Sequence, residues 1–572
     1  MNRIPSWTGR GIPALPPSGF EKEIAVLGAA VESLEKASAA GALPEEQLAA
    51  AVLKTDSARD LVRSLKTVCR ARECLDITDT LAAGWLDDVR RLEDRLEAAA
   101  EGLAAMTAKL PEALKRRPPF AAWCLPLPGA VPRRSPVVSA VMLPLSLQHA
   151  HLTASMHLRV PGSDGLVHSM SSAQAAVVLK TSEDQRLRRA AFGLYSAWFA
   201  ERAPVFADLL NAVLGWKLYE ARLGGGDLIG RSLRAERISS EAYKALLEAL
   251  RLKRAEARAL IGRRAAFLGQ ERLHVSQLLT PMPSGRAAGT ESLFSFARTV
   301  DALCEATKPA DPRFGAWLRN ALANHWIDAQ QSSKRAGGTW CEDMPAHRAV
   351  AIFTNYVPNI ASAFQFAHPC GEGFLHCALH GMQGRLKAVP YAVTEIFTQL
   401  SETLLERGLA RKLKGTGAEA TLRWFSMART SNQLLLTPSR HALLASLCRA
   451  REQGVLSVAA LNAESRRAWD EAFADSVEGF EQYVWCWRPH FYRIGASFCD
   501  WQYSFGYLVS QPLAERFLSE GKTLAGASLA DMARDAVRMD LDALLKKHLG
   551  ADITKTDFWL GAADAALAHA QG

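Results

Sequence analysis

Residues 20–115 place apolar side chains at intervals of three and four, as the core-facing stripe of an amphipathic helix does. The rhythm is clear in two runs, Ile24, Leu27, Val31, Leu34 and Trp85, Val89, Leu92, Leu96. The same block is rich in Ala, Glu, Arg and Leu, which favour helices. We therefore expect an antiparallel hairpin or bundle of helices in this part of the chain.

Seven prolines between Pro118 and Pro144 interrupt the helical pattern. Proline removes a backbone donor and clashes with the preceding turn, so helices do not persist through such a density. The sequence therefore predicts an N-terminal helical region at 1–117, a proline-rich junction at 118–145 and a larger helical body at 146–572.

The periodicity of the body is mainly helical as well. It predicts helices from Thr181 to Ala200, from Val205 to Leu223 and from Ser239 towards Leu268. The apolar, β-branched run at 349–356 predicts a strand. Residues 393–402 predict a helix that carries Glu395 and Glu402 two turns apart on one face. No repeat at a solenoid period is present, so the fold class is mainly α, with a small sheet near the middle.

Composition narrows the class of protein. Of the 572 residues, 49% are hydrophobic and 22% charged, as in ordinary globular proteins and unlike disordered or collagen-like chains. No apolar stretch reaches the about 18 residues that cross a membrane, and the N-terminus shows no secretory signal. The net charge of +9 comes from interleaved basic and acidic residues, whereas nucleic-acid binders show a dense basic face. We therefore expect neither a membrane nor nucleic acid as partner.

The 10 cysteines form no CxxC pair and follow no regular spacing. This pattern argues against a disulfide framework and against a zinc ribbon. Because free thiols persist in reducing compartments, we expect the protein in the cytoplasm.

Candidate chemistry gathers directly after the predicted strand, between Asn359 and His376. The run His368-Pro-Cys-Gly-Glu372 puts a histidine and a glutamate on one face of an unbroken helix. Proline inside a helix clashes with the carbonyl four residues back, and the glycine weakens the helix further. We therefore expect a kink or a new helix start at Pro369.

Several spaced features resemble the oligoendopeptidase F group of thimet-type zinc metallopeptidases. In that family a strand ending in Asn-Tyr leads into a helix with the motif His-Glu-x-x-His, and a later helix supplies a glutamate as third zinc ligand. The features that match are 182–192, Trp326–Asp328, 334–338, Asn355-Tyr356, 488–492 and 501–506. The resemblance implies two helical lobes around a deep channel, with the small sheet near the active-site helix.

By this resemblance His368 keeps the first metal ligand, Glu395 matches the third, and Glu372 replaces the second histidine. Pro369 replaces the glutamate that acts as general base. One divalent metal ion is implied, zinc by the family, although one imidazole and two carboxylates favour iron or manganese. Because a general base contributes about 10²–10⁴-fold, ordinary peptidase activity should be lost with it.

The resemblance also implies residues that line the channel. Substrate-binding positions would be Gly337, Gly338, Asn355 and Tyr356. Catalytic roles are implied for Glu372, His490, Tyr492, Tyr503 and Cys499, the last at the place of the family's transition-state tyrosine. Two further sets stay open: His376 with His380 as a second metal pair, and Cys341, Cys370 and Cys377 as reactive thiols or inert buried side chains.

The sequence thus predicts a divergent metal-dependent enzyme of this fold, acting on a short peptide or an amino-acid-derived small molecule. With iron or manganese, open coordination positions would also permit O₂ chemistry. Two alternatives stay open. One is a metal-free pseudo-peptidase that binds peptides or other partners, and the other is a residual metallopeptidase that uses Glu372 as its base.

Overall fold

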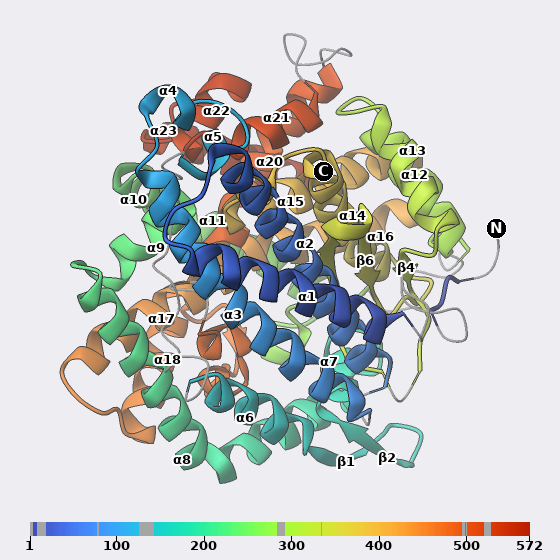
Figure 1. Ribbon diagram of the computed structural model, residues 1–572. Coiled ribbons are helices and arrows are strands. Elements are labelled where there is room, and N and C mark those ends of the chain that lie inside the picture. Colours follow the sequence, from blue (N-terminus) through green and yellow to red (C-terminus); the bar gives the residue numbers. More distant parts are fainter. Residues whose placement is uncertain are drawn as a thin grey trace.

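The computed structural model describes residues 4–7, 19–76, 79–124, 142–282, 292–332, 335–494, 498, 500–519 and 528–571. Its N-terminal part consists of three long helices that pack on one another, α1 (Phe20–Ala39), α2 (Glu45–Leu75) and α3 (Leu81–Ala108), followed by the short α4 (Glu112–Lys115) and α5 (Phe120–Cys124). In Figure 1 the blue helices α1, α2 and α3 cross the middle of the view in front of the body. The predicted helical character of residues 20–115 is confirmed. The predicted domain boundaries stay a prediction, because residues 125–141 lie outside the described part.

In its described residues the body is mainly helical, with a few short strands. Its helices are α6 (Leu143–Ala154), α7 (Ser172–Thr181), α8 (Gln185–Leu223), α9 (Leu228–Glu236), α10 (Ser240–Leu252), α11 (Arg254–Phe267), α12 (Phe296–Thr307), α13 (Arg313–Ala323), α14 (Ile360–Leu379), α15 (Tyr391–Leu413), α16 (Ala418–Ser431), α17 (Thr437–Glu452), α18 (Val458–Phe473), α19 (Val484–Trp487), α20 (Trp501–Ser519), α21 (Leu529–Ala536), α22 (Leu541–Leu549) and α23 (Thr556–Gln571). The mainly-α fold class is confirmed. No helix in the described ranges is both long and apolar enough to span a membrane.

Three predicted helix boundaries were wrong. The helices predicted on either side of Pro204 are one continuous α8, because Pro204 lies on the exposed face, where water can hydrate the carbonyl it leaves unpaired. The single helix predicted from Ser239 is two, α10 and α11, which meet at Lys253. The predicted break at Pro369 is absent, because α14 runs through it with Asn359 as its N-cap.

The small sheet lies between two hydrophobic cores. It consists of β4 (Ile327–Asp328), β5 (Trp340–Met344) and β6 (Ala349–Phe353) in the order β4-β6-β5, with β4 parallel and β5 antiparallel to β6. Side chains alternate across a strand, so Ala349, Ala351 and Phe353 enter the core of α1 to α3, while Val350 and Ile352 enter the main core. The predicted strand is confirmed, and it joins the N-terminal helices to the body. The remaining strands are the hairpin β1 (His157–Pro161) and β2 (Val167–Ser171) and the pair β3 (Leu273–His274) and β7 (Val477–Glu478).

Helix α15 is the centre of the body. It packs against α14 on one side and α20 on the other, and nearly all of its first half is buried. Glycines make both approaches possible: a Cβ on Gly371 would lie 2.3 Å from the carbonyl oxygen of Phe397, and one on Gly506 would lie 2.5 Å from that of Glu395. The packing therefore fixes the spacing between the helices that carry the candidate site.

Candidate functional site

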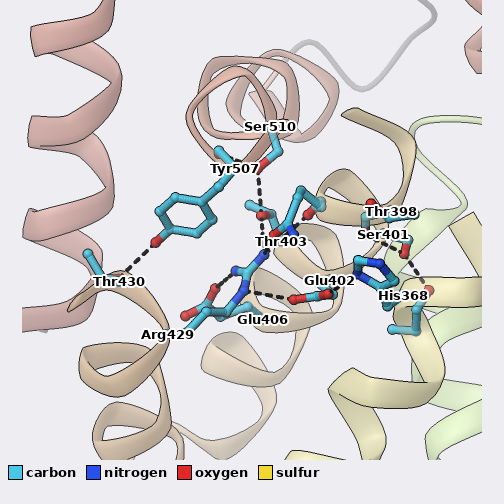
Figure 2. Close-up of polar contacts among 12 residues, drawn as sticks. His368, Thr398, Ser401, Glu402, Thr403, Glu406, Arg429, Thr430, Tyr507 and Ser510 are labelled. Atoms are coloured by element: carbon cyan, nitrogen blue, oxygen red, sulfur yellow. Dashed lines mark hydrogen bonds and ion pairs between the residues drawn. The ribbon is translucent and has the colours of Figure 1, made fainter. Parts of the chain in front are cut away.

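His368 projects from the middle of α14 towards α15. Its Nδ1 lies 2.7 Å from Oε1 of Glu402, which is two turns beyond Glu395 (Figure 2). Burial by itself would lower the pKa of His368, but the hydrogen bond with Glu402 and the charges of Glu395 and Glu402 outweigh it and raise the pKa to about 9. In the protein's own charge distribution, His368 is therefore a cation at neutral pH.

Arg429 of α16 closes a buried charge network around this histidine (Figure 2). Its Nε donates to Glu402 Oε2 at 2.9 Å, and its Nη1 donates to Glu406 Oε2 at 2.6 Å. Its Nη2 donates to Thr403 Oγ1 at 3.2 Å, and its guanidinium lies 4.7 Å from the ring centroid of Tyr507 on α20. Two basic and two acidic side chains thus balance one another and join α14, α15, α16 and α20.

Glu395 is the most enclosed of the predicted metal ligands, with 1% of its surface exposed. The hydroxyl of Thr398 donates to its Oε2 at 3.1 Å. Burial raises the pKa of Glu395, and the nearby charge of His368 opposes that shift. These two predicted ligands therefore lie within each other's electrostatic field.

Glu372 faces a different partner. It lies one turn after His368 on α14, but its Oε1 is 3.7 Å from Nε2 of His376. His380, for which a second metal pair with His376 was left open, contacts Asp343 at 2.8 Å. In the described ranges, no three His, Cys, Asp or Glu side chains are grouped so that they could hold a metal ion. In their present positions the candidate ligands therefore do not fit a three-ligand metal centre.

A chain of hydroxyl groups connects two of the predicted catalytic residues with the start of α15. Tyr391 donates to the hydroxyl oxygen of Tyr503 at 2.7 Å, and His490 Nε2 lies 2.9 Å from the same oxygen. Burial and the charge of Arg488 lower the pKa of His490 to about 3, so its imidazole is neutral at pH 7. Burial and the charge of Glu395 raise the pKa of Tyr503, so its hydroxyl keeps its proton.

Three other predicted site residues donate hydrogen bonds to backbone carbonyl oxygens. The hydroxyl of Tyr492 donates to the carbonyl oxygen of Trp485 at 3.0 Å, and that of Tyr356 donates to the carbonyl oxygen of Phe294 at 2.7 Å. Asn355 Nδ2 donates to the carbonyl oxygen of Ala336 at 3.0 Å. Gly337 and Gly338 are exposed in the loop before β5. Cys499 lies outside the described residues. The functional roles of all six stay predictions.

The cysteines near α14 have no sign of activation. Burial raises the pKa values of Cys341, Cys370 and Cys377, the last to about 12. A thiol reacts or binds metal as its thiolate. At neutral pH these three cysteines are therefore unreactive side chains packed near the site.

Sequence reasoning missed the partners that hold the site. Glu402 was noted only for its spacing from Glu395, while Arg429 and Tyr391 were not noted at all. Arg429 lies among small and apolar neighbours in Ser426-Met-Ala-Arg-Thr430. A basic residue in such a run almost always needs a buried acidic partner, and this is the signal that would have drawn attention to it.

Solved structures show the same fold along the whole chain. PZ peptidase A with an inhibitor superposes with a TM-score of 0.74 at 13% identity, covering 99% of each chain. A protein assigned as an oligoendopeptidase F from Bacillus anthracis gives 0.72 at 13% identity, with 100% and 99% covered. Oligoendopeptidase-F from Enterococcus faecium gives 0.64 at 14% identity, with 97% and 98% covered. No protein-family model matches the sequence, and comparison with curated proteins finds no significant relative. The chain has the oligoendopeptidase F fold.

Proposed function

We propose that this protein binds short peptides in the oligoendopeptidase fold without hydrolysing them. The observation that carries the proposal is the position next to His368, where Pro369 offers no group that takes a proton from water. Hydrolysis of a peptide needs such a base to activate the attacking water. The fold is shared with peptidases along the whole chain, so we infer that loss of the base removes chemistry and leaves binding in place.

The charge network around Arg429 is balanced by the protein's own side chains. Glu402 and Glu406 are neutralised by His368 and Arg429 through contacts of 2.6 to 2.9 Å. Buried carboxylates need such partners or a cation. Because the acidic side chains already have basic partners, this network does not need a bound divalent ion for stability.

A divergent metal-dependent enzyme is the second candidate, and one observation favours it. The contact between Glu372 and His376, at 3.7 Å, is longer than a hydrogen bond. Glu372 is therefore held weakly and can turn towards His368 and Glu395. The resulting set of one imidazole and two carboxylates suits iron or manganese.

The test compares peptide binding with peptide cleavage. The purified protein is supplied in turn with zinc, manganese and ferrous iron, and quenched fluorescent peptides report cleavage while calorimetry reports binding. We expect binding without cleavage under every metal condition. Cleavage that disappears in Glu372→Gln and with chelator would refute the proposal and favour a residual metallopeptidase that uses Glu372 as its base. Metal content of the wild type and of His368→Ala shows independently whether an ion is bound.

A gain of activity provides the complementary test. The double substitution Pro369→Glu with Glu372→His restores a base and a second histidine in the register of the family motif. We expect this variant to bind zinc and to cleave a peptide that the wild type only binds. The single variant Glu372→His is the matched control, because it restores a ligand without the base and should remain inactive.

The free cysteines of the described part of the chain fit a reducing location, and we keep the cytoplasm as the proposed one.

A further inference from the structure

A cavity of about 420 Å³ lies between α7, α8, α17 and the segment 481–488. It is separate from the network around Arg429, but Tyr503 forms part of its wall. Because Tyr503 contacts Tyr391 and His490, the cavity borders the hydroxyl chain of the candidate site. Its volume is that of a pocket for one large side chain and its neighbouring backbone.

One wall of this cavity is an unusual helical segment. Residues Asn432–Leu436, between α16 and α17, form a π-helix, a widened turn that is frequent at functional sites. Asn432, Gln433 and Leu436 all line the cavity. Gln433 is 6% exposed, and its side-chain oxygen has no hydrogen-bond partner in the described part of the protein. A buried acceptor of this kind is costly unless a ligand supplies a donor.

The basic side chains that line the cavity differ in whether an acidic side chain pairs with them. Arg440 is held by both oxygens of Glu481, each at 2.9 Å from its Nη2, and Arg488 pairs with Asp500. Lys180 of α7 lines the cavity too, and among the described residues it makes no ion pair. Lys180 is exposed to the solvent of the cavity, yet desolvation by the surrounding atoms and the charges of Arg440 and Arg488 lower its pKa. The cavity therefore carries one cation without an acidic partner.

Most of the remaining lining is apolar or aromatic. Phe192 and Tyr195 come from α8, Trp487 from the end of α19, and Leu279 and Leu436 add aliphatic surface. The polar members are Ser196, Ser276, Thr437 and Gln482. Trp487 is fixed in place by the guanidinium of Arg440, 5.0 Å from its ring centroid. Such a surface binds a large hydrophobic side chain, while Lys180 and Gln433 select the polar end of the same ligand.

We propose that this cavity binds the C-terminal residue of a peptide, or the equivalent N-acyl amino acid, with a large apolar side chain. The carboxylate meets Lys180, the backbone N–H donates to the side-chain oxygen of Gln433, and the side chain lies against Phe192, Tyr195 and Trp487. A C-terminal residue offers all three features together, which a simple organic acid does not. The inference rests on the proposed function and names the end of the peptide that is recognised.

Calorimetry with the full chain tests the inference. The probes are Ala-Ala-Ala-Phe with a free carboxylate, the same peptide with a C-terminal amide, and N-acetyl-phenylalanine. The variants are Lys180→Met, which keeps the length of the side chain, and Lys244→Met as control, an exposed lysine of α10 away from the cavity. Lys180 is exposed, so its variant should fold, and circular dichroism checks this.

We expect the free peptide to bind about tenfold or more tightly than its amide, since charge-assisted hydrogen bonds are worth about 1.5–3 kcal/mol. Lys180→Met should remove that difference, while Lys244→Met should keep it. If N-acetyl-phenylalanine binds to the wild type and Lys180→Met removes this binding, a single N-acyl amino acid is sufficient to occupy the cavity.

Equal affinity for the acid and the amide, unchanged in Lys180→Met, would overturn the assignment of the C-terminus and leave peptide binding itself intact. Cleavage of the probe with an unchanged preference for the acid would overturn the proposed function and retain the pocket. No binding of any of the three probes would overturn the pocket, and the peptide panel above then decides the function.

Discussion

The substitution Arg429→Met tests whether the buried network holds the centre of the body together. Arg429 is 6% exposed, and Glu406, to which it donates at 2.6 Å, has 3% of its side-chain surface exposed. Without the guanidinium, Glu406 is left as a buried carboxylate whose nearest basic group in the described chain is His569 at 3.7 Å. Removing one partner of a buried pair costs about 3–5 kcal/mol, so we expect a loss of that size in the free energy of unfolding.

Equilibrium urea unfolding followed by circular dichroism measures the loss as a shift of the midpoint. The matched control is Arg423→Met on the same helix. Arg423 pairs with Glu419 at 3.0 Å, with 45% of its side chain exposed, so its loss should cost less than about 0.5 kcal/mol. Adding Glu406→Met to Arg429→Met should recover at least half of the stability, because it removes the unpaired charge. A cost for Arg429→Met as small as that of the control would refute the reasoning.

Three further predictions concern pH, packing and metal. The folded state holds His490 with a pKa of about 3, whereas the unfolded chain takes up its proton below pH 6.5, so stability falls as the pH falls. Between pH 6.5 and 5 the wild type should lose about 1.6 kcal/mol more unfolding free energy than His490→Gln. If the free energies of unfolding of the two proteins changed in parallel with pH, the low pKa of His490 would be contradicted. Gly371→Ala should destabilise by about 1–3 kcal/mol through its contact with Phe397, while Gly193→Ala in α8, where a Cβ has no neighbour within 4 Å, should be neutral or stabilising in the same urea assay. Dialysis against a chelator should leave the melting temperature unchanged, and a clear decrease would reveal a structural metal ion.

The fold was predictable wherever local pattern and burial agree. Strand β6 and helix α14 follow one another as predicted, because a wholly apolar run and then an Asn N-cap define them locally. The continuity of α14 through Pro369 was not predictable, since packing against α15 outweighs the local cost of proline. Gly371 was taken as a weak point of the helix, whereas it is the place where α15 comes closest.

The site was predictable only as far as residues on a single helix define it. His368 and Glu372 share a face of α14, and Glu372 contacts His376 on the same helix. The partner of His368 lies elsewhere in the chain, Glu402 on α15, with Arg429 of α16 behind it. Nothing in the spacing of these residues indicates that they meet. Charge pairing between distant segments is decided by helix packing, so it becomes visible only in three dimensions.

For the proposed function, Pro369 in place of the family's base weighs more than Glu372 in place of its second histidine. A carboxylate is itself a metal ligand, so Glu372 in the second position changes the preferred metal without abolishing coordination. Proline has no side-chain group that accepts a proton, which leaves Glu372, loosely held by His376 at 3.7 Å, as the replacement base on α14. If Glu372 acts as base, only His368 and Glu395 remain for the metal, and if it acts as ligand, the base is missing. Under the proposed roles of these residues, tight metal binding and peptide hydrolysis exclude each other at this site, whereas the proposed binding of a peptide needs neither.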